Sequence, residues 1–274
     1  MDYRIDGKNI IIENAKNFVL AETLDCGQAF RWTLSDGVWE GIAGGKLRRL
    51  SQNGDAVTIY DCDETELNDF YKPYFDLERD YGNIVNAISE NETLKSATEI
   101  AGGIRILRQE PWETLCSFII SQNNNIPRIK GIINRLCENF GDRVEGGYSF
   151  PSAEKIATLA LEDLAPLRSG FRAKYILDAA KKFASGEVSP GRINTLSTDE
   201  AREELMKIYG VGEKVADCTL LFGFSRIDAF PKDVWIKRAM SVLFDGNLPE
   251  CAVPYAGIVQ QYIFHYARMT KLEV

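Results

Sequence analysis

The spacing of apolar residues changes once along the chain, near Glu64, and this change limits the folds open to it. Upstream, the stretch KLRRLSQNGDAVTIYD (46–61) places Asn53-Gly54 between two alternating or β-branched runs, a strong hairpin signal. Downstream, ETELNDFYKPYF and WETLCSFIISQ have apolar residues three and four positions apart, as amphipathic helices do. Strands followed by helices predict an α+β fold, with an N-terminal antiparallel sheet and a mainly helical remainder.

The length of 274 residues allows two or three subdomains, because a single core stops growing near ~250 to 300 residues. We predict a β domain with flanking helices over residues 1–95 and a helical region over residues 96–274. No apolar run reaches the ~18 residues of a membrane span, and the N-terminus lacks the pattern of a secretion signal. We therefore expect no membrane partner and a cytoplasmic location, nucleoid-associated in a bacterium or nuclear in a eukaryote.

Cysteine and histidine usage excludes several kinds of site. The six cysteines are scattered, no two form a C-x-x-C pair, and His265 is the only histidine. Zinc and iron–sulfur centres need clustered ligands, and a Ser-His-Asp triad needs a histidine in the site. We expect reduced thiols, no metal centre and no cofactor, although a cation held by backbone carbonyl oxygens stays open.

The net charge of −8 does not decide the kind of partner, because the charge is unevenly distributed. Residues 1–95 hold 18 of the 40 acidic and 10 of the 32 basic residues. Residues 96–274 are therefore neutral overall and can still carry a basic face. A polyanionic partner of the helical region is not excluded.

A helical hairpin is predicted at residues 199–224. The capping-box pattern STDE (197–200) precedes AREELMKIY, Gly210 stops that helix, and a second helix follows over EKVADCTLLFGF. Backbone amides at Gly210 and Gly212 could bind a DNA phosphate without reading sequence. A plain helical hairpin explains the same residues equally well. At this point Lys214 fits a solvated helix residue, a phosphate contact or a nucleophile.

Two further helix starts bear on the site. Pro127 falls in the first turn of IPRIKGIINRLCENF, so the preceding residues 123–125 form a short linker between helices. Asp233 follows Lys214 by 19 residues and opens a helix after a proline-containing loop. The common role of an aspartate there is an N-cap, and this role is compatible with a chemical one.

Five separated stretches in order resemble one family over nearly the whole chain. GVGEKVADC (210–218) with PKDVW (231–235) looks like the helix-hairpin-helix and catalytic aspartate of a DNA glycosylase superfamily. CGQAFRW (26–32), SQNNNIPRI (121–129) and PYAGIVQQYIF (254–264) are similar to the 8-oxoguanine DNA glycosylase/AP lyase family of the eukaryotic type. The four-cysteine iron–sulfur motif of the endonuclease III and adenine glycosylase branches is missing from this sequence.

The resemblance implies that Lys214 and Asp233 are catalytic. Base removal needs a nucleophile at C1′ of the sugar and a negative charge to stabilise the oxocarbenium-like transition state. Lys214 would supply the amine, and attack by an amine leaves a Schiff base that leads to strand cleavage by β-elimination. Asp233 would stay ionised at its helix N-terminus, where negative charge is favoured.

The resemblance also implies a pocket for a base that has left the helical stack. Cys218 and Phe264 would form its two walls, and Gln260 would hydrogen-bond the Watson–Crick edge of the base. The backbone carbonyl of Gly27 would accept from N7–H of 8-oxoguanine and reject the N7 acceptor of guanine. Without the resemblance, Cys218 and Phe264 read as core residues and Gly27 as a turn residue.

DNA contacts complete the implied site. Asn123 would fill the gap in the duplex, Phe171 would wedge into the stack where relatives more often have tyrosine, and Arg128 and Arg172 would contact the unpaired cytosine. For Arg172 alone, a surface salt bridge is the default expectation. Trp235 stands where relatives frequently have a histidine, which puts the usual phosphate contact there in doubt. The DNA-binding candidates are Asn123, Arg128, Phe171, Arg172, Gly210 and Gly212.

The sequence thus predicts a monomeric, bifunctional DNA repair enzyme that excises 8-oxoguanine opposite cytosine from double-stranded DNA and then nicks the abasic strand. One alternative is an alkylated-base glycosylase of the same superfamily, which usually lacks the lysine nucleophile. Another is a non-catalytic protein that binds DNA through the hairpin. The preference among opposite bases, the relative rates of excision and nicking, and further substrates such as ring-opened purines stay open.

Overall fold

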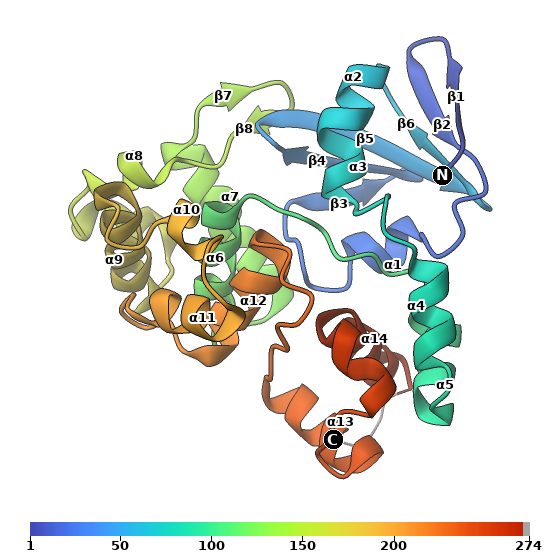
Figure 1. The fold of residues 1–274 in the computed structure, drawn as a ribbon. Helices are drawn as coiled ribbons and strands as arrows, with labels where there is room; N and C mark the ends of the chain where they lie inside the picture. The colour runs from blue at the N-terminus through green and yellow to red at the C-terminus, as the bar shows by residue number, and fades with distance from the viewer. Residues whose placement is uncertain (271–274) are drawn as a thin grey trace.

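An antiparallel sheet forms the N-terminal part of the computed structural model, which describes residues 1–270 (Figure 1). Its strands are β1 (Tyr3–Asp6), β2 (Asn9–Ile12), β3 (Trp32–Ser35), β4 (Val38–Ala43), β5 (Lys46–Asn53) and β6 (Ala56–Ile59). The strand order is β1-β2-β6-β5-β4-β3, and each neighbouring pair is antiparallel. The predicted hairpin is confirmed as β5–β6, where Asn53 pairs with Ala56.

Helices dominate the rest of the chain, as the α+β prediction requires. They are α1 (Leu20–Leu24), α2 (Glu64–Glu66), a π turn η1 (Leu67–Tyr71), α3 (Lys72–Tyr74), α4 (Tyr81–Ile88), α5 (Glu92–Ala101), α6 (Pro111–Ser121), α7 (Ile126–Phe140), α8 (Ala153–Ala157), the 3₁₀ helix η2 (Glu162–Leu167), α9 (Arg172–Ser185), α10 (Pro190–Ile193), α11 (Thr198–Met206), α12 (Glu213–Gly223), α13 (Val234–Phe244), the 3₁₀ helix η3 (Glu250–Tyr255) and α14 (Ala256–Met269). A small hairpin, β7 (Arg143–Val144) and β8 (Gly147–Tyr148), interrupts them.

The sheet has its own apolar core. Every second residue of β2 and β6 is buried, as in Ile10 with Ile12 and Val57 with Ile59, because successive side chains of a strand point to opposite faces. The helical segment η1–α3 packs Tyr71 into the same core. This arrangement buries one face of the sheet under the helices that follow it in sequence.

A second, larger core joins the remaining helices. It takes in buried residues of α4 and α5 together with those of α6 to α14. Leu94 and Ala97 of α5 belong to this core, and residue 95 lies inside the same helix. The division of the chain at residue 95 stays a prediction. Among residues 1–270, no helix is long and apolar enough to cross a membrane.

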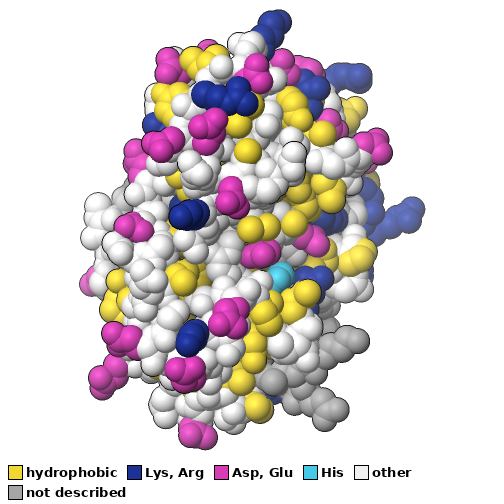
Figure 2. Space-filling model, turned by 90° about the vertical axis from the view of Figure 1, so that its right-hand side faces the viewer, with side chains coloured by type: hydrophobic (Ala, Val, Ile, Leu, Met, Phe, Trp, Pro, Cys, Tyr) yellow, Lys and Arg dark blue, Asp and Glu magenta, His cyan; other side chains and the backbone are white. Residues whose placement is uncertain are grey.

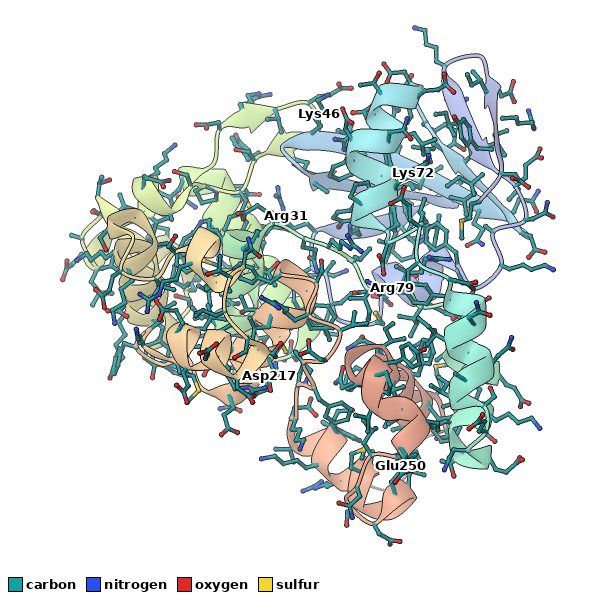
Figure 3. All side chains as sticks on the ribbon, viewed as in Figure 1. Arg31, Lys46, Lys72, Arg79, Asp217 and Glu250 are labelled. Atoms are coloured by element: carbon teal, nitrogen blue, oxygen red, sulfur yellow. The ribbon has the colours of Figure 1, made fainter. Side chains whose placement is uncertain are left out.

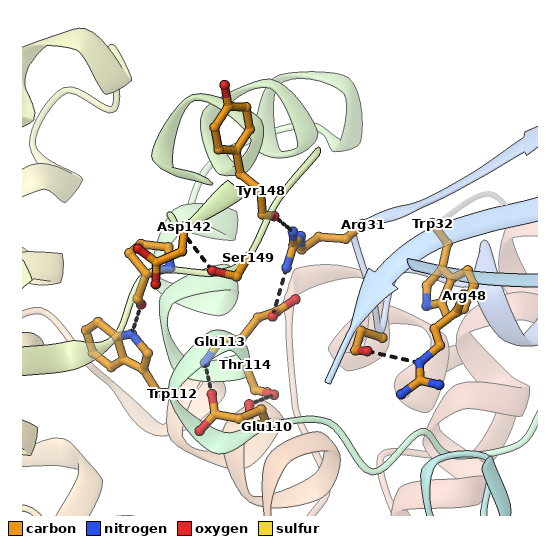
Figure 4. A network of polar contacts seen from close by, with 12 residues as sticks. Arg31, Trp32, Arg48, Glu110, Trp112, Glu113, Thr114, Asp142, Tyr148 and Ser149 are labelled. Atoms are coloured by element: carbon orange, nitrogen blue, oxygen red, sulfur yellow. Dashed lines mark hydrogen bonds and ion pairs between the residues drawn. The ribbon is translucent and has the colours of Figure 1, made fainter. Parts of the chain in front are cut away.

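A partly buried ion pair connects the sheet to the helical region (Figure 4). Arg31, just before β3, contacts Glu113 of α6 at 3.3 Å and donates to the carbonyl of Tyr148 in β8 at 2.5 Å. Burial raises the pKa of Glu113 to about 7, and the Arg31 guanidinium acts in the opposite direction. The contact therefore places a strongly perturbed carboxyl group at the junction of the two cores.

The last helix returns to the first third of the chain. α14 packs along α5, and α13 lies beside α14 (Figure 1). The hydroxyl of Tyr262 reaches the carbonyl of Ile104 at 3.5 Å. Residues 92–101 and 256–269 thus lie side by side although most of the chain separates them.

Candidate active site

The predicted hairpin is present as α11 and α12. The capping box at its start is complete, because the Ser197 hydroxyl accepts from the Glu200 amide while the Glu200 side chain accepts from the Ser197 amide. α11 ends at Met206, four residues before Gly210. The expectation that Gly210 stops the helix is therefore wrong, and Gly210 instead shapes the turn.

The two glycines of the turn have different requirements. Gly210 has φ +80°, and a Cβ there would lie 2.5 Å from the ring of Tyr175. Gly212, the N-cap of α12, has φ −108°, and a Cβ there would meet nothing within 4 Å. Gly210 is thus fixed by packing, whereas the space beside Gly212 is open at the positive end of a helix dipole.

Lys214 lies in the first turn of α12 and points back toward α6. Its Nζ donates to Ser121 Oγ at 3.2 Å and lies 5.0 Å from the ring centroid of Phe118. The side chain is half-buried and lines a cleft of about 640 Å³. A half-buried amine beside an aromatic ring has access to a ligand in the cleft and is partly shielded from water.

The cleft beside Lys214 contains charges of both signs. Its other lining residues are Gln122, Arg202, Gly212, Glu213, Val215, Asp217, Asp228, Phe230, Lys232 and Lys237. Asp217 of α12, labelled in Figure 3, is buried and pairs with Arg202 of α11 at 2.6 Å. Burial raises the pKa of Asp217, while Arg202 opposes this shift. The ion pair links the two helices of the hairpin.

Cys218 brings Lys214 and Asp233 into one neighbourhood. The thiol is buried, and burial raises its pKa to about 11. The positive charge of Lys214 lowers this pKa, and the negative charge of Asp233 raises it. Both charged groups therefore lie close enough to the same sulfur atom to act on it. The thiol itself is neutral near pH 7.

Asp233 is the N-cap of α13. Its Oδ1 accepts from the Ile236 amide at 2.7 Å, so the expected capping role is confirmed. The side chain is half-buried. The cap fixes the orientation of the carboxylate and uses one of its two oxygens.

A second cavity, of about 450 Å³ and mostly apolar, lies between α13, α14 and the start of α7. Phe264 and Trp235 line it, and the Trp235 side chain is 54% exposed. Its other lining residues are Ile126, Ile236, Ala239, Ala267 and Arg268. An apolar cavity with two aromatic walls suits a flat, uncharged ligand group.

Gly27, Cys218 and Gln260 line neither of these two cavities. Gln260 is buried, and its Oε1 accepts from Gln261 Nε2 at 2.7 Å. Gly27 has φ +89° in a loop that the buried Gln28 side chain holds. Arg268 Nη1 approaches the Asp25 carbonyl at 3.5 Å, which ties α14 to the same loop. The four predicted pocket residues are Gly27 in this loop, Gln260 and Phe264 on α14, and Cys218 on α12. The loop and α14 contact each other, but the four residues do not surround a shared open space.

Arg172 differs from its default expectation. Its side chain is buried, and its guanidinium donates to the backbone carbonyls of Gln122, Asn123 and Ser169. No ion pair among residues 1–270 includes it, so the predicted surface salt bridge is wrong. Burial, and secondarily the charge of Arg128, lowers the pKa of Arg172. Its present contacts shape the linker that carries Asn123, which has φ +47°.

Asn123, Arg128 and Phe171 are exposed. Asn123 and Arg128 project from the linker and from α7, whose N-cap is Asn125. Phe171, at the start of α9, is 46% exposed, and the Arg172 guanidinium lies 4.4 Å from its ring centroid. The hydrogen bonds from Arg172 to the carbonyls of Gln122 and Asn123 hold the start of α9 next to the linker before α7.

Two contacts of Lys214 were not predicted from the sequence. Ser121 begins the stretch SQNNNIPRI, and Phe118 lies one helical turn earlier on α6. Their spacing places them on one face of a helix, but this face looks like ordinary core. Only the packing of α12 against α6 identifies their partner.

Comparisons with known proteins agree along the whole fold. Residues 10–115 match the model of the 8-oxoguanine DNA glycosylase N-terminal domain, and residues 116–247 match that of HhH-GPD superfamily base excision DNA repair proteins. An N-glycosylase/DNA lyase of Saccharomyces cerevisiae is 34% identical over 82% of this chain and 68% of its own length.

Two solved structures are also similar. A Clostridium acetobutylicum 8-oxoguanine glycosylase/lyase, in complex with double-stranded DNA containing cytosine opposite 8-oxoG, is 38% identical, with a TM-score of 0.91 over 99% of this chain and 100% of its own. MBOgg1, in complex with a low affinity DNA ligand, is 41% identical, with a TM-score of 0.92 and the same coverage. This chain therefore belongs to the 8-oxoguanine DNA glycosylase family of N-glycosylase/DNA lyases.

Proposed function

We propose that the protein excises 8-oxoguanine from double-stranded DNA through a covalent lysine intermediate and then cleaves the strand at the abasic site. The observation that carries this proposal is a half-buried Lys214 amine facing a cleft beside Phe118, with the Asp233 carboxylate fixed as an N-cap nearby and both charges acting on Cys218. One group is an amine and the other a carboxylate, which are the two kinds of group the reaction needs. Membership of the N-glycosylase/DNA lyase family supports it.

In the first step, unprotonated Lys214 Nζ attacks C1′ of the damaged nucleoside. The C1′–N9 bond breaks, its electron pair leaves with the base, and the base takes up a proton. Positive charge develops on the sugar ring, and the Asp233 carboxylate stabilises it. Because Asp233 is held by the Ile236 amide, its charge is oriented before the substrate arrives.

In the second step, the sugar ring opens and the lysine nitrogen forms a Schiff base with C1′. Loss of a proton from C2′ then expels the 3′ phosphate by β-elimination, and water hydrolyses the Schiff base to free Lys214. Attack by water in place of the amine would yield an intact abasic strand. Strand cleavage is therefore the signature of Lys214.

We propose that the extruded base lies against Phe264, with the Gly27 carbonyl and Gln260 as its polar contacts. Phe264 already lines an apolar cavity, and Arg268 links α14 to the loop of Gly27.

Borohydride trapping tests the chemistry. The protein is incubated with a duplex containing 8-oxoguanine opposite cytosine in the presence of sodium borohydride, which reduces a Schiff base to a stable adduct. We expect a covalent protein–DNA band with the wild type and none with Lys214→Gln. Lys232→Gln removes an equal charge from the same cleft and keeps the adduct even where its DNA affinity falls.

Absence of the adduct from the wild type, or its persistence in Lys214→Gln, would contradict the proposal. Release of 3-methyladenine without strand nicking would favour the alkylated-base alternative instead. A panel of duplexes with each of the four bases opposite the lesion measures the preference for cytosine, which we expect to be greatest. Because the substrate is DNA, we infer that the enzyme acts in the compartment that holds the chromosome.

A further inference from the structure

An exposed row of three aromatic rings connects the start of α9 to the hairpin turn. Phe171 and Tyr175 have ring centroids 5.6 Å apart, and Tyr175 and Tyr209 have theirs 5.1 Å apart, both in edge-to-face geometry. Phe171 and Tyr209 are 46% and 55% exposed. Large aromatic side chains left in solvent at two ends of one row indicate a surface that is covered by a partner.

This row is rigid because α9 and the turn are fastened together. The Tyr209 amide donates to Asp178 of α9 at 2.7 Å, and Lys182 of α9 donates to the Lys207 carbonyl at 2.5 Å. The Tyr175 ring leaves no room for a Cβ at position 210. The turn therefore cannot move relative to α9 without breaking both hydrogen bonds and disturbing the close packing of Gly210 against Tyr175.

Lys174 is held by rings rather than by a carboxylate. Its Nζ lies 5.6 Å from the ring centroid of Tyr175 and 5.3 Å from that of Tyr209. On the same helix, Lys182 pairs with Asp178 and Glu187, whereas no ion pair within residues 1–270 includes Lys174. Two aromatic faces position a cation and leave its charge available to an anion.

The anion that fits this position is a phosphate of the DNA backbone. Tyr209 directly precedes the turn in which the space beside Gly212 is open, and Phe171 at the other end of the row is the candidate wedge. Lys174 lies between Phe171 and the turn, so a duplex that contacts both of them passes close to its amine. On the opposite side of the molecule, Figure 2 shows acidic side chains spread among the basic ones.

We propose that Lys174, positioned between the rings of Tyr175 and Tyr209, is a phosphate-binding residue that contacts the DNA backbone next to the hairpin turn. This inference rests on the proposed function, because it takes DNA as the ligand. The Lys174 contact would fix the position of the protein along the DNA backbone, so that Phe171 and the turn bind at a constant spacing.

Salt dependence of DNA binding tests the proposal. Affinity for a duplex with a tetrahydrofuran abasic analogue is measured by fluorescence anisotropy from about 50 to 300 mM KCl. Loss of one phosphate contact makes the slope of log K against log[salt] shallower by about 0.9, and weakens binding roughly five- to tenfold near 0.1 M. We expect this change for Lys174→Gln.

The matched control is Lys181→Gln. Lys181 is an exposed lysine seven residues further along α9, roughly 10 Å away, so its loss removes the same charge from the same helix. We expect its slope to match that of the wild type. Tyr209→Leu should reproduce part of the effect of Lys174→Gln, and Tyr209→Phe, which keeps the ring, should not.

Equal slopes for Lys174→Gln and Lys181→Gln would overturn the proposal, since the effect would then be one of total charge. A slower excision rate at saturating enzyme without any change of slope would overturn it as well. If the wild type binds the duplex but forms no borohydride adduct, the proposed chemistry fails while the phosphate contact remains testable. Thermal unfolding of each variant confirms that it is folded.

Discussion

At the scale of single residues, the most informative group is Asp233, because it has two separable properties. Its oxygen caps α13 by accepting from Ile236, and its charge acts on the site around Cys218. An amide oxygen can perform the first task as well as a carboxylate can, but it cannot perform the second. A single substitution can therefore separate stability from chemistry.

Asp233→Asn should leave the free energy of unfolding within about 1 kcal/mol of the wild type, because asparagine is an equally good N-cap. The single-turnover rate of base excision should fall roughly 100-fold or more, since the stabilising charge is lost. Asp233→Ala loses both properties and should be destabilised by about 1 kcal/mol as well. Urea unfolding and quench-flow excision assays separate the two effects. An excision rate for Asp233→Asn close to that of the wild type would contradict a charge-based role.

Prediction from sequence succeeded for residues that belong to a local pattern. The N-cap role of Asp233 and the helical position of Lys214 follow from spacing, capping and turn residues. The pairing of Lys214 with Ser121 and the burial of Arg172 depend on contacts between distant elements. No local pattern contains that information, which is why a surface salt bridge was the wrong default for Arg172.

At the scale of elements, the shape of the hairpin turn depends on its two glycines. Gly210 has a left-handed backbone conformation under the ring of Tyr175, whereas Gly212 has an ordinary conformation with free space beside it. Sequence alone gave both glycines the same role. In the structure, Gly210 is needed for packing against Tyr175, whereas Gly212 leaves the end of α12 accessible to a ligand.

Gly210→Ala should lower the free energy of unfolding by roughly 1 to 3 kcal/mol, because the new methyl group meets the Tyr175 ring and the left-handed φ becomes strained. Gly212→Ala should change it by less than about 1 kcal/mol. If the Gly212 side of the turn receives a phosphate, Gly212→Ala should still weaken binding to duplex DNA. Paired chemical denaturation and anisotropy measurements check this, and equal destabilisation by both variants would contradict it.

Element boundaries were predictable where the chain provides caps and prolines. α7 begins beside Pro127, and α12 ends near the predicted residue 224. The π turn η1 and the short hairpin β7–β8 were not predicted, because each spans no more than six residues and depends on packing by the rest of the fold. The arrangement of the predicted pocket residues was less predictable still, since they come from a loop and two helices and do not surround a shared open space.

At the scale of the whole molecule, the junction between sheet and helices contains a titratable group. Glu113 lies partly buried beside Arg31 (Figure 4), and desolvation raises its pKa to about 7. A carboxyl group whose pKa is raised on folding favours the folded state when protonated. Its contribution to stability is therefore fully present below its unfolded pKa, near 4.5, and is lost as the pH rises through about 7.

We expect the stability of the wild type relative to Glu113→Gln to fall by roughly 1 to 3 kcal/mol between pH 5 and pH 8, because glutamine does not titrate. Urea unfolding of both proteins at several pH values measures this difference. Glu138→Gln, at an exposed position on α7, serves as a control for the general effect of removing a carboxylate. A difference that stays constant with pH would show that Glu113 does not titrate in this range.

The return of α14 to α5 has a consequence for the synthesis of the protein. Gln260 and Phe264 lie on the last helix, whereas Gly27 and the helix that supports α14 leave the ribosome much earlier. A nascent chain can complete its sheet and its hairpin, with Lys214 in place, while the helix that carries the proposed base contacts is still being translated. Under the proposed function, the DNA-binding hairpin can therefore form before the residues proposed to select the base are available.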